Sequence, residues 1–147
     1  MKDSQTRLDD IITKLRERNF RITPQRIAIL EAFLNSDKHP SVEMVYEDVR
    51  KTFRTISLAT VYKTVSLLKE LEEILEIGFS TGHNRYDGKK PYPHPHLICS
   101  KCNAIIEPEI DLLQQITAEV EKNSGYRILS SQLEFFGICP DCQKKPD

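Results

Sequence analysis

Two pairs of cysteines, each with the spacing C-x-x-C, constrain the fold of this chain more than any other feature of its 147 residues. Cys99 and Cys102 form the first pair, Cys139 and Cys142 form the second, and 36 residues separate the pairs. A tight turn lets both thiolates of one pair bind the same ion, and two such turns supply the four sulfurs that a closed tetrahedral Zn²⁺ site prefers. The spacing therefore predicts one structural zinc ion per subunit, at a four-cysteine site that brackets a small domain.

The same four cysteines could instead form disulfides or redox motifs. A thiol oxidoreductase requires an accessible cysteine whose pKa is lowered by a neighbouring cation. Cys99 and Cys139 stand in strand-like segments, and the histidines nearest to them in sequence are His94 and His96. We favour zinc and no enzymatic activity, and two alternatives stay open: a C-x-x-C oxidoreductase and a zinc-dependent adaptor that binds only protein.

The composition carries no sign of a membrane or secreted protein. Hydrophobic residues make up 39% of the chain and charged residues 29%, which is typical of a globular protein. No apolar run approaches the roughly 18 residues of a membrane span, and the N-terminus alternates charged and apolar residues. We expect a cytoplasmic protein, where the reducing environment disfavours disulfides.

The first half of the chain reads as a series of helices. Apolar residues recur with helical spacing between Leu8 and Leu15, which predicts one amphipathic helix. Thr23, Ser41 and Ser57 each stand where a helix N-cap belongs, because each precedes a run with helical periodicity. We expect helices to begin directly after these three residues.

The helix after Ser57 has two different faces. Its expected buried stripe consists of Leu58, Val61, Val65 and Leu68. The residues that face away from this stripe are Ala59, Tyr62, Lys63 and Ser66. We expect the second group to be exposed on the last helix of the series.

A β-hairpin is predicted after the helices. The segments ILEIGF (74–79) and RYD (85–87) are β-prone, and STGHN (80–84) between them is rich in turn formers. Helices followed by a two-stranded ribbon indicate a winged helix-turn-helix. This architecture places a helix in the major groove of DNA.

The charge of the chain is divided unequally between its halves. The net charge is −1, but residues 1–90 contain 16 Lys and Arg against 14 Asp and Glu, whereas residues 91–147 contain 5 against 8. The first half is therefore the one that can face phosphate. The bias is weak, so DNA binding has to be argued from the pattern of residues.

Prolines at positions 91, 93 and 95 separate the two halves, because they prevent regular helix and favour a stiff, extended connection. We expect an α+β fold with a winged helix-turn-helix domain over residues 1–88, a hinge over 89–95, and a small α/β dimerisation domain over 96–147. A unit of about 55 residues buries little apolar surface, so we expect both a bound metal ion and a partner subunit to stabilise it.

Four elements are predicted in the second half. Strands are expected at HLICS (96–100) and AIIEP (104–108), an amphipathic helix at DLLQQITAEVEKN (111–123), and a long strand at YRILSSQLEFFGIC (126–139). The long strand would deliver the second cysteine pair beside the first.

Two histidines next to the prolines need a separate explanation if zinc takes all four sulfurs. His94 and His96 are two positions apart, so both rings project from the same face of an extended strand. They are either solvated hinge residues or ligands of a second ion. Further candidate ligands are His39 before a predicted helix, Asp87 at the end of the hairpin, and Glu107 after the first cysteine pair.

Nearly the whole chain resembles the ferric uptake regulator (Fur) family of dimeric, metal-dependent transcriptional repressors, which includes iron sensors and PerR-type peroxide sensors. The resembling segments are RITPQRIAIL (21–30), HPSVEMVY (39–46), SLATVYKTV (57–65), NRYD (84–87), HPHLICSKC (94–102) and GICPDC (137–142). Each segment alone is modest evidence, but their order and spacing together are specific.

The resemblance implies a regulatory site for Fe²⁺ or Mn²⁺ with ligands from both halves. Its ligands would be His39, Asp87, His94, His96 and Glu107. Three imidazoles with two carboxylates suit these ions better than the soft four-sulfur set does. Metal binding would then fix the winged domain in the arrangement that fits DNA.

The resemblance also assigns SLATVYKTV as the recognition helix of a homodimer that binds a palindromic operator. The implied DNA-binding residues are Arg21, Gln25, Arg26, Ser57, Ala59, Thr60, Tyr62, Lys63 and Ser66. Tyr62 can offer its ring to a thymine methyl group, and Lys63 can reach base edges or phosphate.

Two positions of the regulatory set indicate different subtypes. Asp87 follows the pattern of peroxide sensors, whereas Glu107 follows that of iron sensors. The sequence therefore predicts a repressor of peroxide-stress or iron-homeostasis genes, with an iron-uptake regulator that does not sense peroxide as the alternative.

Overall fold

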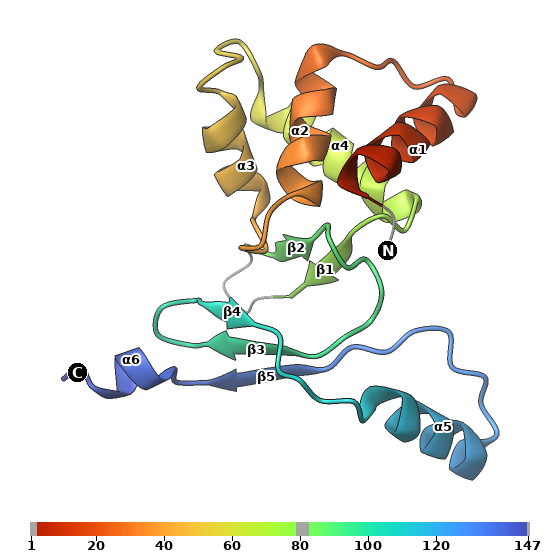
Figure 1. Ribbon diagram of the computed structural model, residues 1–147, viewed down its shortest axis with the longest axis vertical. Coiled ribbons are helices and arrows are strands. Elements are labelled where there is room, and N and C mark those ends of the chain that lie inside the picture. The colour runs from red at the N-terminus through yellow and green to blue at the C-terminus, as the bar shows by residue number, and fades with distance from the viewer. Residues whose placement is uncertain (1–2, 79–82, 147) are drawn as a thin grey trace. The chain divides into compact units, whose positions relative to one another are not determined.

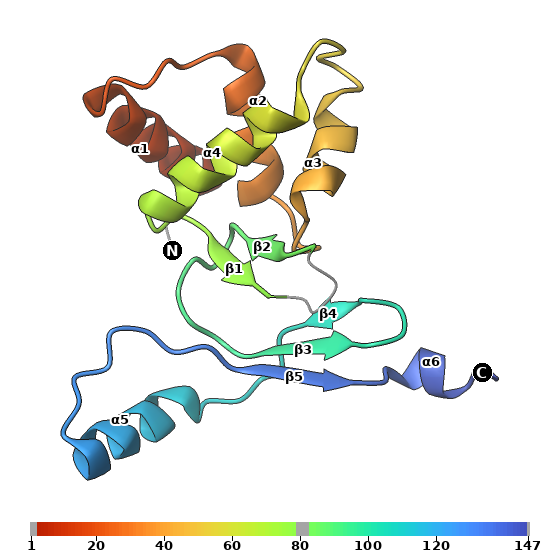
Figure 2. The ribbon, with the colours of Figure 1, turned by 180° about the vertical axis from the view of Figure 1, so that it is seen from behind.

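The computed structural model describes residues 3–78 and 83–146 and confirms the expected α+β class. The chain divides into two compact units, Met1–Tyr92 and Pro93–Asp147. The first contains four helices and a hairpin, and the second contains a three-stranded sheet and two helices (Figures 1 and 2). None of the helices within the described residues is both long enough and apolar enough to span a membrane.

The helices of the first unit begin where the caps predict. Thr23, Ser41 and Ser57 each accept a hydrogen bond from a backbone N–H three residues ahead, at 3.2 Å in every case. These bonds satisfy donors that the first turn of a helix leaves without an intrahelical partner. The four helices are α1 (Ser4–Glu17), α2 (Pro24–Leu34), α3 (Val42–Val49) and α4 (Leu58–Glu70).

A single apolar core joins these four helices. α1 buries Leu8, Ile11 and Leu15 against it, as its periodicity predicts. In α4 the expected stripe is wrong at one end: Leu58 is 37% exposed, because the buried face of the helix is centred on Val61, Thr64 and Leu68. The buried residues of α4 are Val61, Thr64, Val65, Leu67 and Leu68.

The predicted hairpin consists of β1 (Leu75–Ile77) and β2 (Arg85–Asp87), which pair antiparallel with Glu76 opposite Tyr86. The first three residues of the predicted turn, and Phe79 before them, lie outside the described residues. Tyr86 packs edge-on against Phe33 of α2, with ring centroids 5.9 Å apart. This contact fixes the hairpin on the helical core.

Gly88 directly follows β2 and lies against the backbone of Phe33 in α2. A Cβ atom at this position would lie 2.2 Å from the carbonyl oxygen of Phe33 and 2.6 Å from its carbonyl carbon. Backbone atoms of a helix cannot move aside at low cost, so only glycine fits here. Arg7 of α1 also donates to the carbonyl oxygen of Gly88.

The second unit is built on a sheet with the strand order β4-β3-β5. β3 (His96–Cys99) pairs antiparallel with β4 (Ile105–Ile106) and parallel with β5 (Glu134–Gly137). The long strand expected over 126–139 is wrong in length, because only its last third pairs with β3. The helix α5 (Leu113–Ser124) ends at Gly125, whose φ of 73° is a left-handed cap.

The second unit leaves much of its apolar surface exposed. α5 contains no buried residue, and its apolar side chains Ile116 and Val120 are 48% and 46% exposed. In β5, Phe135 and Phe136 are 44% and 56% exposed. So many large apolar side chains left exposed in a small unit indicate that a partner covers part of this surface.

We expect Gly88→Ala to destabilise the first unit by about 3 kcal/mol, because the added methyl group overlaps the Phe33 carbonyl. Denaturant unfolding followed by helical circular dichroism measures this change. Gly78→Ala is the matched control, because a Cβ atom there meets no atom within 4 Å. Equal stability of the two variants would contradict the close packing of Gly88.

Candidate metal centres and nucleic-acid interface

The four cysteine sulfurs of the second unit lie together. One Sγ atom from each of Cys99, Cys102, Cys139 and Cys142 is within 4.8 Å of the others. The Sγ atoms of Cys102 and Cys139 are 3.8 Å apart. Four sulfurs at about 2.3 Å from a tetrahedral Zn²⁺ would be roughly 3.8 Å from one another, so this cluster fits a structural zinc site.

The parallel pairing of β3 with β5 explains how two distant cysteine pairs meet. Cys99 lies opposite Gly137 in the sheet, so the chain that leaves β5 reaches the first pair within two residues. Cys139 then caps the short helix α6 (Pro140–Gln143), and its sulfur accepts the backbone N–H of Cys142 at 3.4 Å. The sequence pattern did not indicate this last helix.

Backbone amides prepare the cluster for a cation. The N–H of Cys139 donates to the Cys99 sulfur at 3.3 Å, and this bond with that of Cys102 lowers the pKa of Cys99 to about 6. A hydrogen bond with the Cys139 sulfur, together with burial, raises the pKa of Cys142 to about 12. Four thiols this close together cannot all lose their protons without a cation, because the thiolates would repel one another. A bound divalent cation offsets this repulsion.

In the first unit, His39 and Asp87 form a buried pair. The Nε2 atom of His39 lies 3.1 Å from Oδ2 of Asp87. The other carboxylate oxygen, Oδ1, accepts the backbone N–H groups of Lys89 and Lys90 at 3.0 and 2.9 Å. The carboxylate is therefore held at both oxygens, and it keeps the imidazole in one orientation.

The backbone of His39 is strained and is held from β2. Its φ of 49° is left-handed, which is uncommon for a residue with a side chain. The guanidinium of Arg85 donates to the carbonyl oxygens of His39 and Lys38, and the N–H of Tyr86 donates to that of Pro40 at 3.0 Å. β2 thus positions both the backbone and the ring of His39.

The other three predicted ligands lie close together in the second unit. The rings of His94 and His96 have centroids 4.3 Å apart, and Nε2 of His94 is 3.4 Å from Oε1 of Glu107. His96 begins β3, whereas His94 precedes it. Two imidazoles with a carboxylate form a nitrogen–oxygen donor set that suits Fe²⁺, Mn²⁺ or Zn²⁺.

α4 presents most of the predicted DNA-binding residues on its surface. Those that are exposed are Ser57, Ala59, Tyr62, Lys63 and Ser66, whereas Thr60 is half-buried. The hydroxyl of Ser66 donates to the carbonyl oxygen of Tyr62 at 3.1 Å. Tyr62 and Lys63 are thus the large side chains that project from this face.

The hydroxyl of Tyr62 is already engaged within the protein. It donates to Oε1 of Glu43 in α3 at 2.6 Å, and Nδ1 of His83 lies 3.7 Å from the same oxygen. The hydrogen bond lowers the pKa of Glu43 and raises the pKa of Tyr62.

The predicted DNA-binding residues at the start of α2 differ in exposure. Arg21 is exposed, whereas Gln25 and Arg26 are half-buried. Arg26 donates to the carbonyl oxygen of Arg21. This bond ties the segment before α2 to its first turn.

The sequence profile of the ferric uptake regulator family matches residues 17–136. The chain belongs to this family. It is 38% identical over 145 residues to a ferric uptake regulation protein of Bacillus subtilis, with 96% of this chain and 97% of that protein covered. It is also 33% identical over 141 residues to the peroxide-responsive repressor PerR of Staphylococcus saprophyticus, with 94% and 93% covered.

Solved structures share the fold. The ferric uptake regulator Fur of Helicobacter pylori matches with a TM-score of 0.86 at 22% identity, over 99% of this chain and 97% of that one. Membership of the Fur family makes this chain a metal-responsive DNA-binding regulator, and the regulators of this family are dimeric. The predicted family and function are thereby confirmed at this level.

Reasoning from the sequence missed two residues that position others. Arg85 was read only as part of a strand, although it holds the strained backbone at His39. Glu43 stands in the first turn of α3, where an acidic residue is explained by the helix dipole alone. Neither position carries a sequence signal for its contact, because each partner is more than 15 residues away.

We expect Cys102→Ser to abolish stoichiometric zinc binding and to unfold the second unit. Cys102 is exposed, so its loss removes a ligand without opening the core. Structural zinc sites contribute on the order of 10 kcal/mol to folding, so losing one of four thiolates should lower zinc affinity by several orders of magnitude. Metal analysis after dialysis against a chelator, with amide exchange of β3 and β5, measures both effects.

Ser100→Ala is the control for this experiment. Ser100 is exposed in the same turn, and its contact with β5 is made by its backbone N–H. It should retain zinc and amide protection like the unmodified chain. Full zinc content in Cys102→Ser would show that the cluster is not a four-sulfur site.

Proposed function

We propose that this protein is a PerR-like or Fur-like repressor in which one regulatory Fe²⁺ or Mn²⁺ ion is shared by the two units. Its ligands are His39 and Asp87 of the first unit with His94, His96 and Glu107 of the second. One structural zinc ion per subunit occupies the four cysteines. The observation that carries the proposal is the pairing of buried His39 with Asp87, at 3.1 Å, on a strained backbone.

A purely structural role does not explain that pair well. A strained backbone costs on the order of 1–3 kcal/mol, and such strain is found mainly where function requires it. The left-handed turn at His39 places the imidazole against a carboxylate that is already saturated on its other oxygen. The site offers a rigid nitrogen and oxygen to a cation, which is what a preorganised ligand set requires.

The switch follows from how the ligands are distributed. An ion bound by residues of both units favours one arrangement of the DNA-binding unit in the dimer, and two recognition helices then match the half-sites of a palindrome. A hundredfold preference for that arrangement, roughly 2.7 kcal/mol, is enough for a useful switch. In this proposal the exposed apolar side chains of α5 and β5 are covered by the partner subunit.

The donor sets argue against the other functional classes. The cysteine sulfurs form one tight cluster, which fits a closed zinc site better than the exposed thiolate of an oxidoreductase. The exposed face of α4, with Tyr62 and Lys63, gives the chain a surface that a protein-only adaptor would not need.

We expect His39→Ala to lose metal-dependent DNA binding while it keeps its zinc. The relevant measurement is anaerobic titration of a palindromic duplex, selected by the unmodified protein from a randomised pool, with Fe²⁺, Mn²⁺ and Zn²⁺ in turn. The regulatory metal should raise the affinity for the duplex about a hundredfold in the unmodified protein and should leave it unchanged in this variant. Asp87→Asn should do the same.

A pair of acid variants provides the matched control. Glu107→Gln removes a proposed ligand, whereas Glu109→Gln removes the same charge two residues later from an exposed side chain. Only the first should weaken the metal response. A full metal response in His39→Ala or Glu107→Gln would overturn the shared site.

Peroxide distinguishes the two subtypes, for which Asp87 and Glu107 give opposite indications. We expect hydrogen peroxide to release iron-loaded protein from the duplex and to leave manganese-loaded protein bound, because oxidation of a ligand histidine requires the iron. Mass spectrometry should then find one added oxygen atom in the peptide of His39 or of His94. Iron-dependent binding that survives peroxide without this change would identify an iron-uptake regulator instead.

A further inference from the structure

Glu43 is an acidic residue on a surface that the proposed function turns toward DNA. It stands in the first turn of α3, and its side chain is 38% exposed. A carboxylate near phosphate groups weakens binding, so an acid at this place needs another reason to be there. The contacts of Glu43 supply this reason. Its carboxylate accepts a hydrogen bond from the Tyr62 hydroxyl of α4 and lies near His83 in the segment before β2.

The contact with Tyr62 decides what that side chain can offer to DNA. A tyrosine hydroxyl has one hydrogen to donate, and the 2.6 Å bond to Glu43 uses it. Phosphate oxygens are acceptors only, so a hydroxyl in this state cannot donate to the DNA backbone. Tyr62 is 46% exposed, and its ring is left as the part that can contact a base.

We propose that Glu43 is a positioning residue for operator recognition, which holds the Tyr62 ring as a reader of bases and keeps its hydroxyl away from phosphate. Contact between an aromatic ring and the thymine methyl group depends on sequence, whereas a hydroxyl–phosphate bond does not. Glu43 therefore raises specificity at some cost in total affinity. This inference rests on the proposed function, since it takes α4 as the recognition helix.

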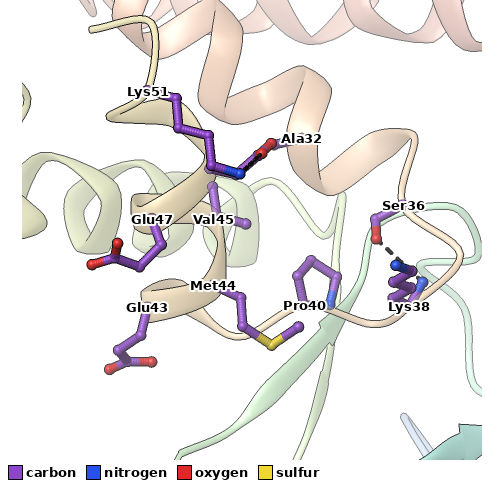
Figure 3. Close-up of a pocket in the computed structure, with 10 residues that line it drawn as sticks. Ala32, Ser36, Lys38, Pro40, Glu43, Met44, Val45, Glu47 and Lys51 are labelled. Carbon is purple, nitrogen blue, oxygen red and sulfur yellow. Dashed lines mark hydrogen bonds and ion pairs between the residues drawn. The ribbon is translucent and has the colours of Figure 1, made fainter. Parts of the chain in front are cut away.

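Glu47 offers a matched control one turn further along α3. Figure 3 shows that Glu43 and Glu47 both extend from α3 away from Pro40 and Lys38, at the rim of the groove between α2 and α3. Glu47 contacts Arg50, the C-cap residue of the same helix, at 3.2 Å. Glu47→Ala thus removes the same charge from the same helix without touching the tyrosine.

The test compares the affinity for the selected palindromic duplex with the affinity for a scrambled duplex of equal length, using zinc-loaded protein with Mn²⁺. Glu43→Ala should lower this specificity ratio by about tenfold, because the ring loses its anchor and the freed hydroxyl can bind phosphate. Glu47→Ala should leave the ratio unchanged. Glu43→Gln retains an acceptor oxygen, and its ratio should stay within about twofold of the unmodified value.

A double-mutant cycle separates positioning from direct contact. Tyr62→Phe should lower the ratio by no more than Glu43→Ala does, because it releases the ring without leaving a hydroxyl that can bind phosphate. The double variant Glu43→Ala/Tyr62→Phe should match Tyr62→Phe. Additive losses would mean that Glu43 contacts DNA by itself, and would overturn the proposal. An unchanged ratio in Glu43→Ala, or an equal loss in Glu47→Ala, would overturn it as well.

The experiment distinguishes a failure of the proposed function from a failure of the role of Glu43. If the unmodified protein selects no duplex with any metal, the repressor assignment is wrong and the role of Glu43 falls with it. If the unmodified protein binds its duplex and Glu43→Ala keeps the full ratio, only the role of Glu43 is wrong. Thermal unfolding of the single variants should match the unmodified chain, since these side chains lie at the surface.

Discussion

The contacts of the Asp87 carboxylate hold together the part of the first unit that we propose binds a metal ion. One oxygen meets the ring of His39, and the other accepts two backbone N–H groups of the turn that follows β2. Gly88, between Asp87 and Lys89 in the sequence, packs directly on the backbone of Phe33. The His39–Asp87 pair, the end of the hairpin and the turn that follows it are therefore held together by direct contacts. A cation bound by His39 and Asp87 would therefore be connected to the helical core through only a few residues.

The second unit depends on a different constraint, because it has little core of its own. Ile98, Cys99 and Cys142 are among its few buried apolar side chains, and two of these three belong to the sulfur cluster. Area-based hydrophobic stabilisation is correspondingly small. A cation held by four thiolates and a partner that covers α5 and β5 would each supply what the core lacks. Folding, metal content and association would then be coupled in this unit.

Short sequence motifs correctly predicted the helix starts and the cysteine cluster. Thr23, Ser41 and Ser57 cap their helices as expected, and the cysteine spacing predicted a cluster whose sulfurs meet. The errors come from packing. Leu58 has helical spacing but lies at the edge of the buried face of α4, and the segment over 126–133 pairs with no strand among the described residues. Contacts such as Arg85 with Lys38 and Tyr62 with Glu43 join distant segments, so no local pattern encodes them.

Strand β3 shows how one short segment could serve both the four-cysteine cluster and the proposed regulatory site. His96 and Cys99 are three residues apart, and side chains alternate along a strand, so the two donors face opposite sides of the sheet. The thiolates on one side favour zinc, whereas imidazole and carboxylate on the other favour harder ions. A sulfur on the imidazole side would bind zinc tightly and hold the switch in one state. In the proposed site, the alternation of the strand would keep the regulatory ligands free of sulfur and therefore able to exchange their metal.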